Sequence, residues 1–264
     1  MNCRDTTDMS AELRAALRAA DAAAEISRAY YGGNLTVSTK ADMTPVTQAD
    51  VECEEKIREI LLDEFPEHGF YGEETGRIRD DSELLWLVDP IDGTKGFVRQ
   101  YPFFSTQIAL MRKGEIILGV SNGVMMDERV WAERGNGAWL NGDALRVSNI
   151  DSLERASLST GNLKTLASSD GWQKLGEVVA TVDRIRGYGD FYHYHLLAAG
   201  KIDAVVESDV SILDIAALSV IVTEAGGVFT DMNGNAPGLE TRSVLAANPA
   251  LHAELLARLG GSVN

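Results

Sequence analysis

The chain has 264 residues, of which 45% are hydrophobic and 24% charged, and its formal net charge is −16. This composition is typical of a globular protein, and the negative charge, with no compensating basic stripe, argues against a nucleic-acid polymer as partner. No run approaches the roughly 20 apolar residues that span a bilayer, and the polar first ten residues do not resemble a secretion signal, so we expect a cytoplasmic protein without a membrane partner.

The numbers and spacing of cysteine and histidine argue against a disulfide framework and against a zinc site. Cys3 and Cys53 are the two cysteines, which indicates no disulfide framework and fits a reducing compartment. The four histidines form no zinc motif, and the two closest, His193 and His195, lie two residues apart in an expected helix and so face different sides. Any metal site would therefore use oxygen ligands, as Mg²⁺, Mn²⁺ and Ca²⁺ do.

Hydrophobic periodicity and turn residues predict two halves. The first has amphipathic helices at 10–31 and 48–64, and then a largely antiparallel sheet that starts with the apolar run 84–88. The second alternates strands and helices, as an α/β layer does. We expect an α+β half over 1–150 and an α/β half over 151–264. Further strands are expected at 105–111, 115–121, within 128–147, and at 155–159, 183–187, 202–207, 228–231 and 243–247, and further helices at 169–180, 190–199, 212–225 and 249–259.

The sharpest motif is D-P-I-D-G-T at residues 89–94, directly after an apolar run. It places the carboxylates of Asp89 and Asp92 so close together that they repel each other unless a cation lies between them. Gly93 allows the backbone to approach a ligand closely. Taken alone, the segment is equally compatible with a simple turn, because Asp, Pro and Gly are common turn residues.

Three other acidic segments are ambiguous by themselves. Gly72-Glu73-Glu74 reads as a solvated loop, and Asp214 reads as an N-cap at the start of an apolar helix. Thr47-x-x-Asp50, within the longer run Lys40 to Asp50, has the spacing of a capping box with Asp in place of Glu.

Together, these segments resemble the inositol monophosphatase superfamily of metal-dependent, lithium-sensitive phosphatases. The similarity covers residues 40–230 and follows the order P-V-T-x-x-D, G-E-E, D-P-I-D-G-T and D-I-A-A-L … E-A-G-G. The resemblance implies a layered αβαβα sandwich, and because members of the superfamily usually form dimers, we expect a homodimer.

The resemblance also implies the ligands of two to three Mg²⁺ ions, with Mn²⁺ as a possible substitute. Glu73, Asp89 and the Ile91 carbonyl would hold the first ion. Asp89, Asp92 and Asp214 would hold the second, so that Asp89 bridges the two. A third, weaker ion would lie near Glu73 and water.

The same resemblance assigns the remaining catalytic parts. Thr94, hydrogen-bonded with Asp50, would orient or deprotonate the attacking water, and the backbone N–H groups of Gly93 and Thr94 would receive the phosphate at a helix N-terminus. Metals lower the pKa of water and stabilise the leaving oxygen, so phosphoryl transfer to water needs no Ser, Cys or His nucleophile. The expected partner is a small phosphorylated metabolite.

The substrate is predicted from residues 40–47 and 189–207, which resemble the histidinol-phosphate phosphatase branch. Histidinol phosphate carries an amine and an imidazole, for which Asp190 and Glu207 are suitable anchors. The alternative interpretation is that Asp190 caps a helix and Glu207 ends a strand. Leu213 departs from the Trp or Tyr that many members carry there, which leaves the pocket wall less defined.

Three other functions remain open. The first is an inositol-1-phosphate phosphatase, and the second is a phosphatase of 3′-phosphoadenosine 5′-phosphate, whose branch the run Lys95-Gly96-Phe97 resembles. The third is a catalytically silent regulatory member of the fold, in which a metal ligand would be expected to be lost.

Overall fold

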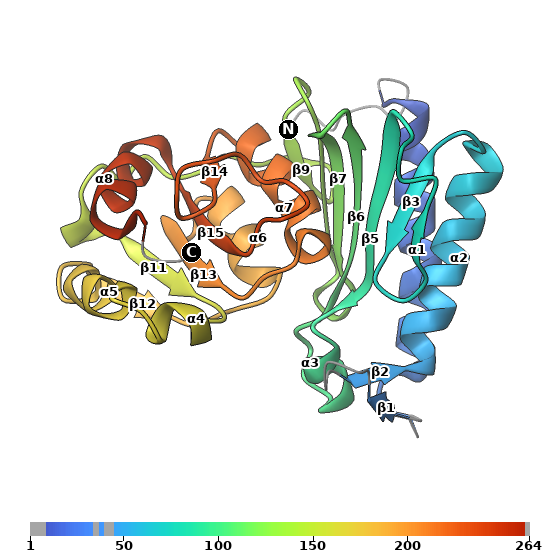
Figure 1. The fold of residues 1–264 in the computed structure, drawn as a ribbon, viewed down its shortest axis with the longest axis horizontal. Coiled ribbons are helices and arrows are strands. Elements are labelled where there is room, and N and C mark those ends of the chain that lie inside the picture. Colours follow the sequence, from blue (N-terminus) through green and yellow to red (C-terminus); the bar gives the residue numbers. More distant parts are fainter. Residues whose placement is uncertain (1–8, 34–36, 40–44, 262–264) are drawn as a thin grey trace.

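The computed structural model describes residues 9–33, 37–39 and 45–261, and these form five layers (Figure 1). Helices α1 and α2 cover one face of an eight-stranded sheet, α6 and α7 separate this sheet from a five-stranded sheet, and α4, α5 and α8 lie outermost. The expected αβαβα sandwich is therefore confirmed. The helices span Ala11–Tyr30 (α1), Gln48–Glu64 (α2), Lys164–Ala167 (α4), Gly171–Val179 (α5), Tyr192–Ala198 (α6), Ile212–Glu224 (α7) and Pro249–Leu259 (α8).

The eight-stranded sheet has the order β10-β9-β8-β7-β6-β5-β3-β4. All its neighbours are antiparallel except β3 and β5, which run parallel. Its strands span Gly69–Gly72 (β3), Gly76–Ile78 (β4), Leu84–Asp92 (β5), Ser105–Arg112 (β6), Glu115–Gly123 (β7), Glu128–Glu133 (β8), Ala138–Leu140 (β9) and Asp143–Ala144 (β10).

Strand β5 is apolar from Leu84 to Val88 and buried from Leu85 onward, because helices cover both faces of the sheet. We expected this strand to end at residue 88, but it continues through Asp92. The neighbouring strand β6 supplies the reason, because Asp89 pairs with Gln107 and Asp92 with Ser105 across an irregular register. The extension carries both carboxylates of the D-P-I-D-G-T motif to the end of the sheet.

Helix α7 explains how the two halves meet. Its residues are apolar on all sides, as expected for a helix that is buried all round. It packs against β5, β6, β7 and β8 on one side and against β14 on the other. Helices α6 and α7 come from the second half of the sequence yet cover the first sheet, so the packing does not separate the two halves. The division near residue 150 therefore stays a prediction.

The five-stranded sheet has the order β12-β11-β13-β15-β14. Strand β11 runs parallel to both neighbours, whereas β15 pairs antiparallel with β13 and β14. The strands span Ser157–Thr160 (β11), Arg184–Arg186 (β12), Ala204–Ser208 (β13), Val228–Thr230 (β14) and Ser243–Ala247 (β15).

Most expected elements are present, with ends that shift by a residue or two. The sequence pattern did not predict the β3–β4 hairpin, which precedes the motif strand, or the small pair β1 (Val37–Thr39) and β2 (Pro45–Thr47). Short α4 and the one-turn helices Val124–Met126 and Leu153–Arg155 were not predicted either. Within the described ranges, no helix is long and apolar enough to cross a membrane.

Candidate active site

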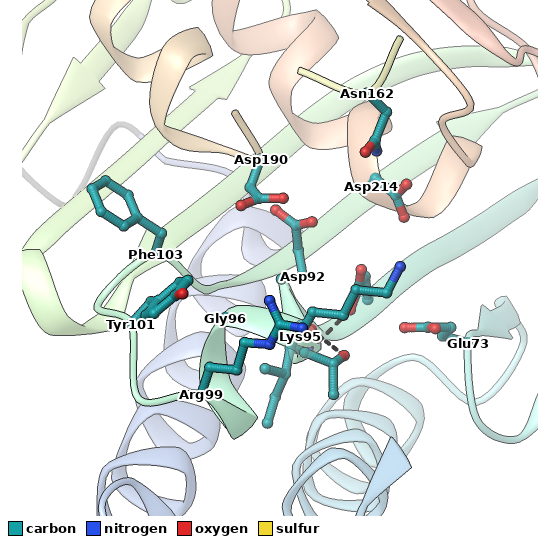
Figure 2. Close-up of a pocket in the computed structure, with 14 residues that line it drawn as sticks. Glu73, Asp92, Lys95, Gly96, Arg99, Tyr101, Phe103, Asn162, Asp190 and Asp214 are labelled. Carbon is teal, nitrogen blue, oxygen red and sulfur yellow. Dashed lines mark hydrogen bonds between the residues drawn. The ribbon is translucent and has the colours of Figure 1, made fainter. Parts of the chain in front are cut away.

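A cavity of about 360 Å³ opens where β5 ends, beside the start of α7. Five segments that are far apart in the sequence meet around it: the turn after β3, the D-P-I-D-G-T segment with helix α3 (Thr94–Val98) and the loop that follows it, the loop after β11, the loop before α6 and the first turn of α7. Figure 2 shows its side chains. The cavity is lined by Glu73, Asp89, Ile91, Asp92, Gly93, Thr94, Lys95, Gly96, Arg99, Tyr101, Phe103, Asn162, Asp190 and Asp214.

The D-P-I-D-G-T segment turns from a buried strand into a helix at the base of this cavity. The Asp89 side chain accepts a hydrogen bond from the Ile91 N–H (3.0 Å), which fixes the carboxylate close to its own backbone. Gly93 then adopts a φ of +89°, and a Cβ there would lie 2.7 Å from the Phe103 carbonyl oxygen. Only glycine satisfies both the left-handed backbone and the close approach. Helix α3 begins at the next residue, as expected.

Thr94 and Asp50 are brought together, as the sequence predicted. The Thr94 hydroxyl lies 3.3 Å from Asp50 Oδ1 and 3.1 Å from the Ile91 carbonyl oxygen, so its single proton is directed to one of these acceptors. The other oxygen of Asp50 accepts from the Thr47 N–H (2.7 Å) and hydroxyl (2.5 Å). The expected capping box of α2 is thus present, and one carboxylate serves the helix and the site together.

Asp214 has the same double position at α7. Ser211 is the N-cap, and Asp214, three residues on, accepts a hydrogen bond from the Ser211 N–H (2.9 Å). The side chain therefore closes a capping box rather than acting as the N-cap itself. Burial raises the pKa of Asp214 to about 7, and Glu73, Glu207 and Asp190 contribute in the same direction.

The turn that carries Glu73 is held by a second acidic residue, which no sequence motif had indicated. Glu54, fully buried on α2, accepts hydrogen bonds from the N–H groups of Glu74 (2.8 Å) and Thr75 (2.7 Å) and from the Thr75 hydroxyl (2.5 Å). Gly72 makes this approach possible, because a Cβ there would lie 2.4 Å from the Glu54 carboxyl carbon. The turn that carries Glu73 is thereby fixed to α2.

The carboxylates raise one another's pKa. The pKa of Asp89 lies well above its usual range because of burial and then of Glu73, Asp92 and Asp214. The pKa of Asp92 is also raised well above its usual range, by burial and then by Asp190, Asp214 and Glu207. Such crowding is relieved when a cation neutralises the charge.

The donors suit a hard cation. They are carboxylates and one backbone carbonyl, the oxygen ligands that Mg²⁺ and Mn²⁺ accept. In the described ranges, however, no three acidic, histidine or cysteine side chains are gathered closely enough to form a ready-made metal cage. Glu73, Asp89, Asp92 and Asp214 share the cavity but approach it from different sides (Figure 2).

The two expected substrate residues are placed differently. Asp190 is exposed in the cavity and faces Asp92 (Figure 2). It is not the cap of α6, which begins after Phe191 without a side-chain cap. Glu207 is 5% exposed within β13, and its oxygens accept from the Asn162 N–H (3.0 Å) and the Tyr194 hydroxyl (2.9 Å). It borders a small cavity of about 30 Å³ that Asp190 also lines.

Several cavity residues were not predicted as site residues. Lys95, Arg99, Tyr101 and Phe103 come from α3 and the loop after it, and Asn162 follows β11. Their position directly after the D-P-I-D-G-T motif was the available signal for the first four. Lys40, Asp42 and Thr44, which contributed to the substrate prediction, lie outside the described residues.

Residues 8–263 match the model of the inositol monophosphatase family. The chain belongs to this family. It is therefore a phosphatase. The chain is 41% identical to a histidinol-phosphatase of Mycobacterium tuberculosis over 94% of this chain and 97% of the relative. It is 37% identical to an inositol-1-monophosphatase of Mesorhizobium japonicum, over 84% and 85% of the two chains.

Among solved structures, the chain is similar to the extragenic suppressor protein suhB from Bartonella henselae. That protein is 34% identical, with a TM-score of 0.88 over 96% of this chain and 100% of that chain.

Proposed function

We propose that this phosphatase depends on Mg²⁺ and hydrolyses histidinol phosphate in the cytoplasm. The observation that carries the substrate assignment is the exposed carboxylate of Asp190 in a cavity that already holds four other acidic side chains. A cationic leaving group gains from this charge, whereas a neutral polyol does not. The histidinol-phosphatase name of the Mycobacterium tuberculosis relative supports the same substrate.

The metal ligands would be Glu73, Asp89, Asp92, Asp214 and the Ile91 carbonyl, in the arrangement implied by the resemblance. Bound Mg²⁺ supplies charge neutralisation at the phosphate oxygens and lowers the pKa of a coordinated water. Two ions, with a third more weakly held, agree with the acidic cavity, and the raised pKa values of Asp89 and Asp92, caused by burial and by the neighbouring carboxylates, support a cation at this position.

The water is oriented by Thr94 and Asp50. Because the Thr94 hydroxyl directs its proton to Asp50 Oδ1 or the Ile91 carbonyl, its lone pairs are left to accept a hydrogen from the attacking water. Burial raises the pKa of Asp50, which makes this carboxylate a better proton acceptor behind Thr94. The first N–H groups of α3, at Gly93 and Thr94, have no partners within the helix and receive the phosphate.

The leaving group extends toward Asp190 and Phe103, which both line the cavity. The Phe103 ring is held by an edge-to-face contact with Tyr192 (5.8 Å), and Tyr192 in turn contacts Tyr188 (6.1 Å). An imidazole ring can pack on Phe103 while its N–H groups or the neighbouring amine contact Asp190. Glu207 remains a predicted substrate residue, and it contributes negative charge from the adjoining small cavity.

One observation favours a different substrate. Lys95 and Arg99 line the cavity, and two basic side chains suit the second phosphate of 3′-phosphoadenosine 5′-phosphate. A single phosphate group already accounts for Lys95, however. Inositol-1-phosphate is the remaining alternative, supported by the name of the Mesorhizobium japonicum relative.

The test is phosphate release with Mg²⁺ from all three esters, by the wild type and by the Asp190→Asn variant. Loss of one charge-assisted contact costs about 1.5–3 kcal/mol, so kcat/KM for histidinol phosphate is expected to fall about 10- to 100-fold. The values for inositol-1-phosphate should change little. The exposed Asp183, outside the cavity, provides the control Asp183→Asn.

Equal losses with both esters would remove the assignment of Asp190. Preference for another ester would retain the metal chemistry but replace the substrate. Asp92→Asn should abolish release while circular dichroism shows a retained fold, and unchanged turnover in that variant would refute the metal mechanism. Wild-type protein that turns over none of the esters would favour a silent regulatory member.

A further inference from the structure

A row of polar side chains leads from Asp92 across strands β6 and β7 to His195 on α6, and ends at Glu128 on β8. Its members come from β6, β7, α6 and β8, and each of the first four is at most 3% exposed. We call it the buried polar chain, and it consists of Ser105, Gln107, Ser121, His195 and Glu128. Polar groups inside an apolar core are costly unless fully paired, so such a continuous row calls for an explanation.

The contacts join end to end. Ser105 Oγ lies 3.2 Å from Asp92 Oδ2, and Gln107 Nε2 lies 2.7 Å from Ser105 Oγ and 3.0 Å from Ser121 Oγ. Ser121 Oγ lies 2.7 Å from His195 Nε2. On the far side of the ring, His195 Nδ1 lies 3.0 Å from the Glu128 carboxylate.

The donor and acceptor in each of these hydrogen bonds can be assigned by starting from Glu128, the end of the chain that is farthest from Asp92. The Glu128 carboxylate can only accept, so it places the ring proton of neutral His195 on Nδ1 and leaves Nε2 as an acceptor. The Ser121 hydroxyl must then donate to Nε2 and can accept from Gln107. Burial lowers the pKa of His195, which agrees with a neutral ring.

The amide of Gln107 is thereby oriented. Its NH₂ group donates to both serines, and its Oε1 has no hydrogen-bond partner among the described residues. Because Ser105 accepts from this NH₂, its own proton is available to Asp92. If the amide were reversed, Ser105 would donate to Gln107 Oε1, and Asp92 would lose its hydrogen bond.

We propose that the buried polar chain is a positioning device that keeps the Ser105 proton on Asp92 and holds that carboxylate in place for a divalent cation. Ser121 and His195 are positioning residues that act through Gln107 and Ser105. The inference rests on the proposed function in one respect, which is that Asp92 is a metal ligand. Hydrogen-bond partners of metal ligands commonly set metal affinity in this way.

The first test measures Mn²⁺ binding to substrate-free protein by the electron paramagnetic resonance of free Mn²⁺. Ser121→Ala and Ser105→Ala are each expected to weaken binding about tenfold. The double variant should bind no more weakly than the weaker single variant, because both changes remove the same hydrogen bond to Asp92. Ser219→Ala is the matched control, since Ser219 is 4% exposed and donates to the Ala216 carbonyl (2.7 Å) on α7, outside the chain. It should bind Mn²⁺ as the wild type does.

The second readout is the protonation of the His195 ring, from its ¹⁵N chemical shifts. A proton on Nδ1 and a bare Nε2 are expected, and the reverse would overturn the proposal. Effects of Ser121→Ala and Ser105→Ala that multiply in the double variant would also overturn it, because they would then act independently.

Asp92→Asn separates this inference from the proposed function. If Asp92→Asn loses Mn²⁺ binding while Ser121→Ala binds as the wild type does, the positioning role fails and the metal assignment stands. If Asp92→Asn itself binds as the wild type does, the metal assignment fails and takes the positioning role with it.

Discussion

Glu54 ties helix α2 to the turn that carries Glu73, and Glu54→Gln tests how firmly that turn is held. The carboxylate is fully buried and accepts three hydrogen bonds, two at Oε1 from Thr75 and one at Oε2 from the Glu74 N–H. A glutamine preserves the shape and can keep the two bonds at Oε1. Its NH₂ group must then face the Glu74 N–H, so that one bond is replaced by a clash of two donors.

The size of the effect follows from this count. One lost charge-assisted bond costs about 1.5–3 kcal/mol, and the two retained bonds weaken because the acceptor is no longer charged. We therefore expect the free energy of unfolding to fall by about 2–3 kcal/mol. For a chain of this length, each kcal/mol lowers Tm by about 2–4 °C, so that Tm should fall by about 4–12 °C.

The assay is urea unfolding followed by circular dichroism, with thermal unfolding as a second measurement. Glu55→Gln is the control, because Glu55 is the next residue on α2 but is exposed. A surface change of this kind alters stability by no more than about 0.5 kcal/mol. Equal stabilities of the two variants would refute the view that Glu54 anchors the turn.

Mg²⁺ should raise Tm more at pH 8 than at pH 5. In the metal-free folded protein, the pKa values of Asp89 and of Asp214 (about 7) are raised above those in the unfolded chain. The protonated carboxyl groups therefore stabilise the fold fully at a pH below their unfolded pKa, and this stabilisation is lost as the pH rises through their folded pKa. Mg²⁺ must displace these protons, so the increase in Tm that it causes should grow as the pH rises from 5 to 8. Equal increases in Tm at both pH values, measured by differential scanning fluorimetry, would contradict this. Cys53 should resist thiol reagents in the folded protein, because burial raises its pKa to about 12. In a Cys3→Ser variant, Ellman's reagent should label Cys53 only as urea unfolds the chain. Rapid labelling without urea would contradict this, because it would show that Cys53 is accessible in the folded protein.

The sequence predicted the elements well where periodicity was clear. The Thr47–Asp50 spacing predicted a capping box that the structure shows, and the apolar run before Asp89 predicted a buried strand. The length of that strand was underestimated, because pairing of Asp92 with Ser105 depends on a neighbour that lies further along the chain. Local pattern does not reveal which strand will extend another.

The supporting residues were not predictable for the same reason. Glu54 looks like any glutamate on an amphipathic helix, and its burial arises from Gly72 on a different element. In the sequence, Gln107 and Ser121 look like outward-facing polar residues of two strands. Only the register between β6 and β7 shows that they lie opposite each other. Acidic motifs identified the cavity, whereas the contacts that hold its side chains are long-range.

The two capping boxes have a consequence for how the catalytic centre could change through mutation. At Asp50 and at Asp214, one carboxylate oxygen is occupied by the first turn of a helix. The rotamers of both side chains are therefore selected when the helices form, and the entropy of ordering them is lost during folding rather than when a ligand binds. A substitution at either position also loosens a helix end, and α7 contacts both sheets. A homologue that lost either aspartate would therefore also lose stability at a helix end. It would need stabilising substitutions elsewhere in the fold to remain folded.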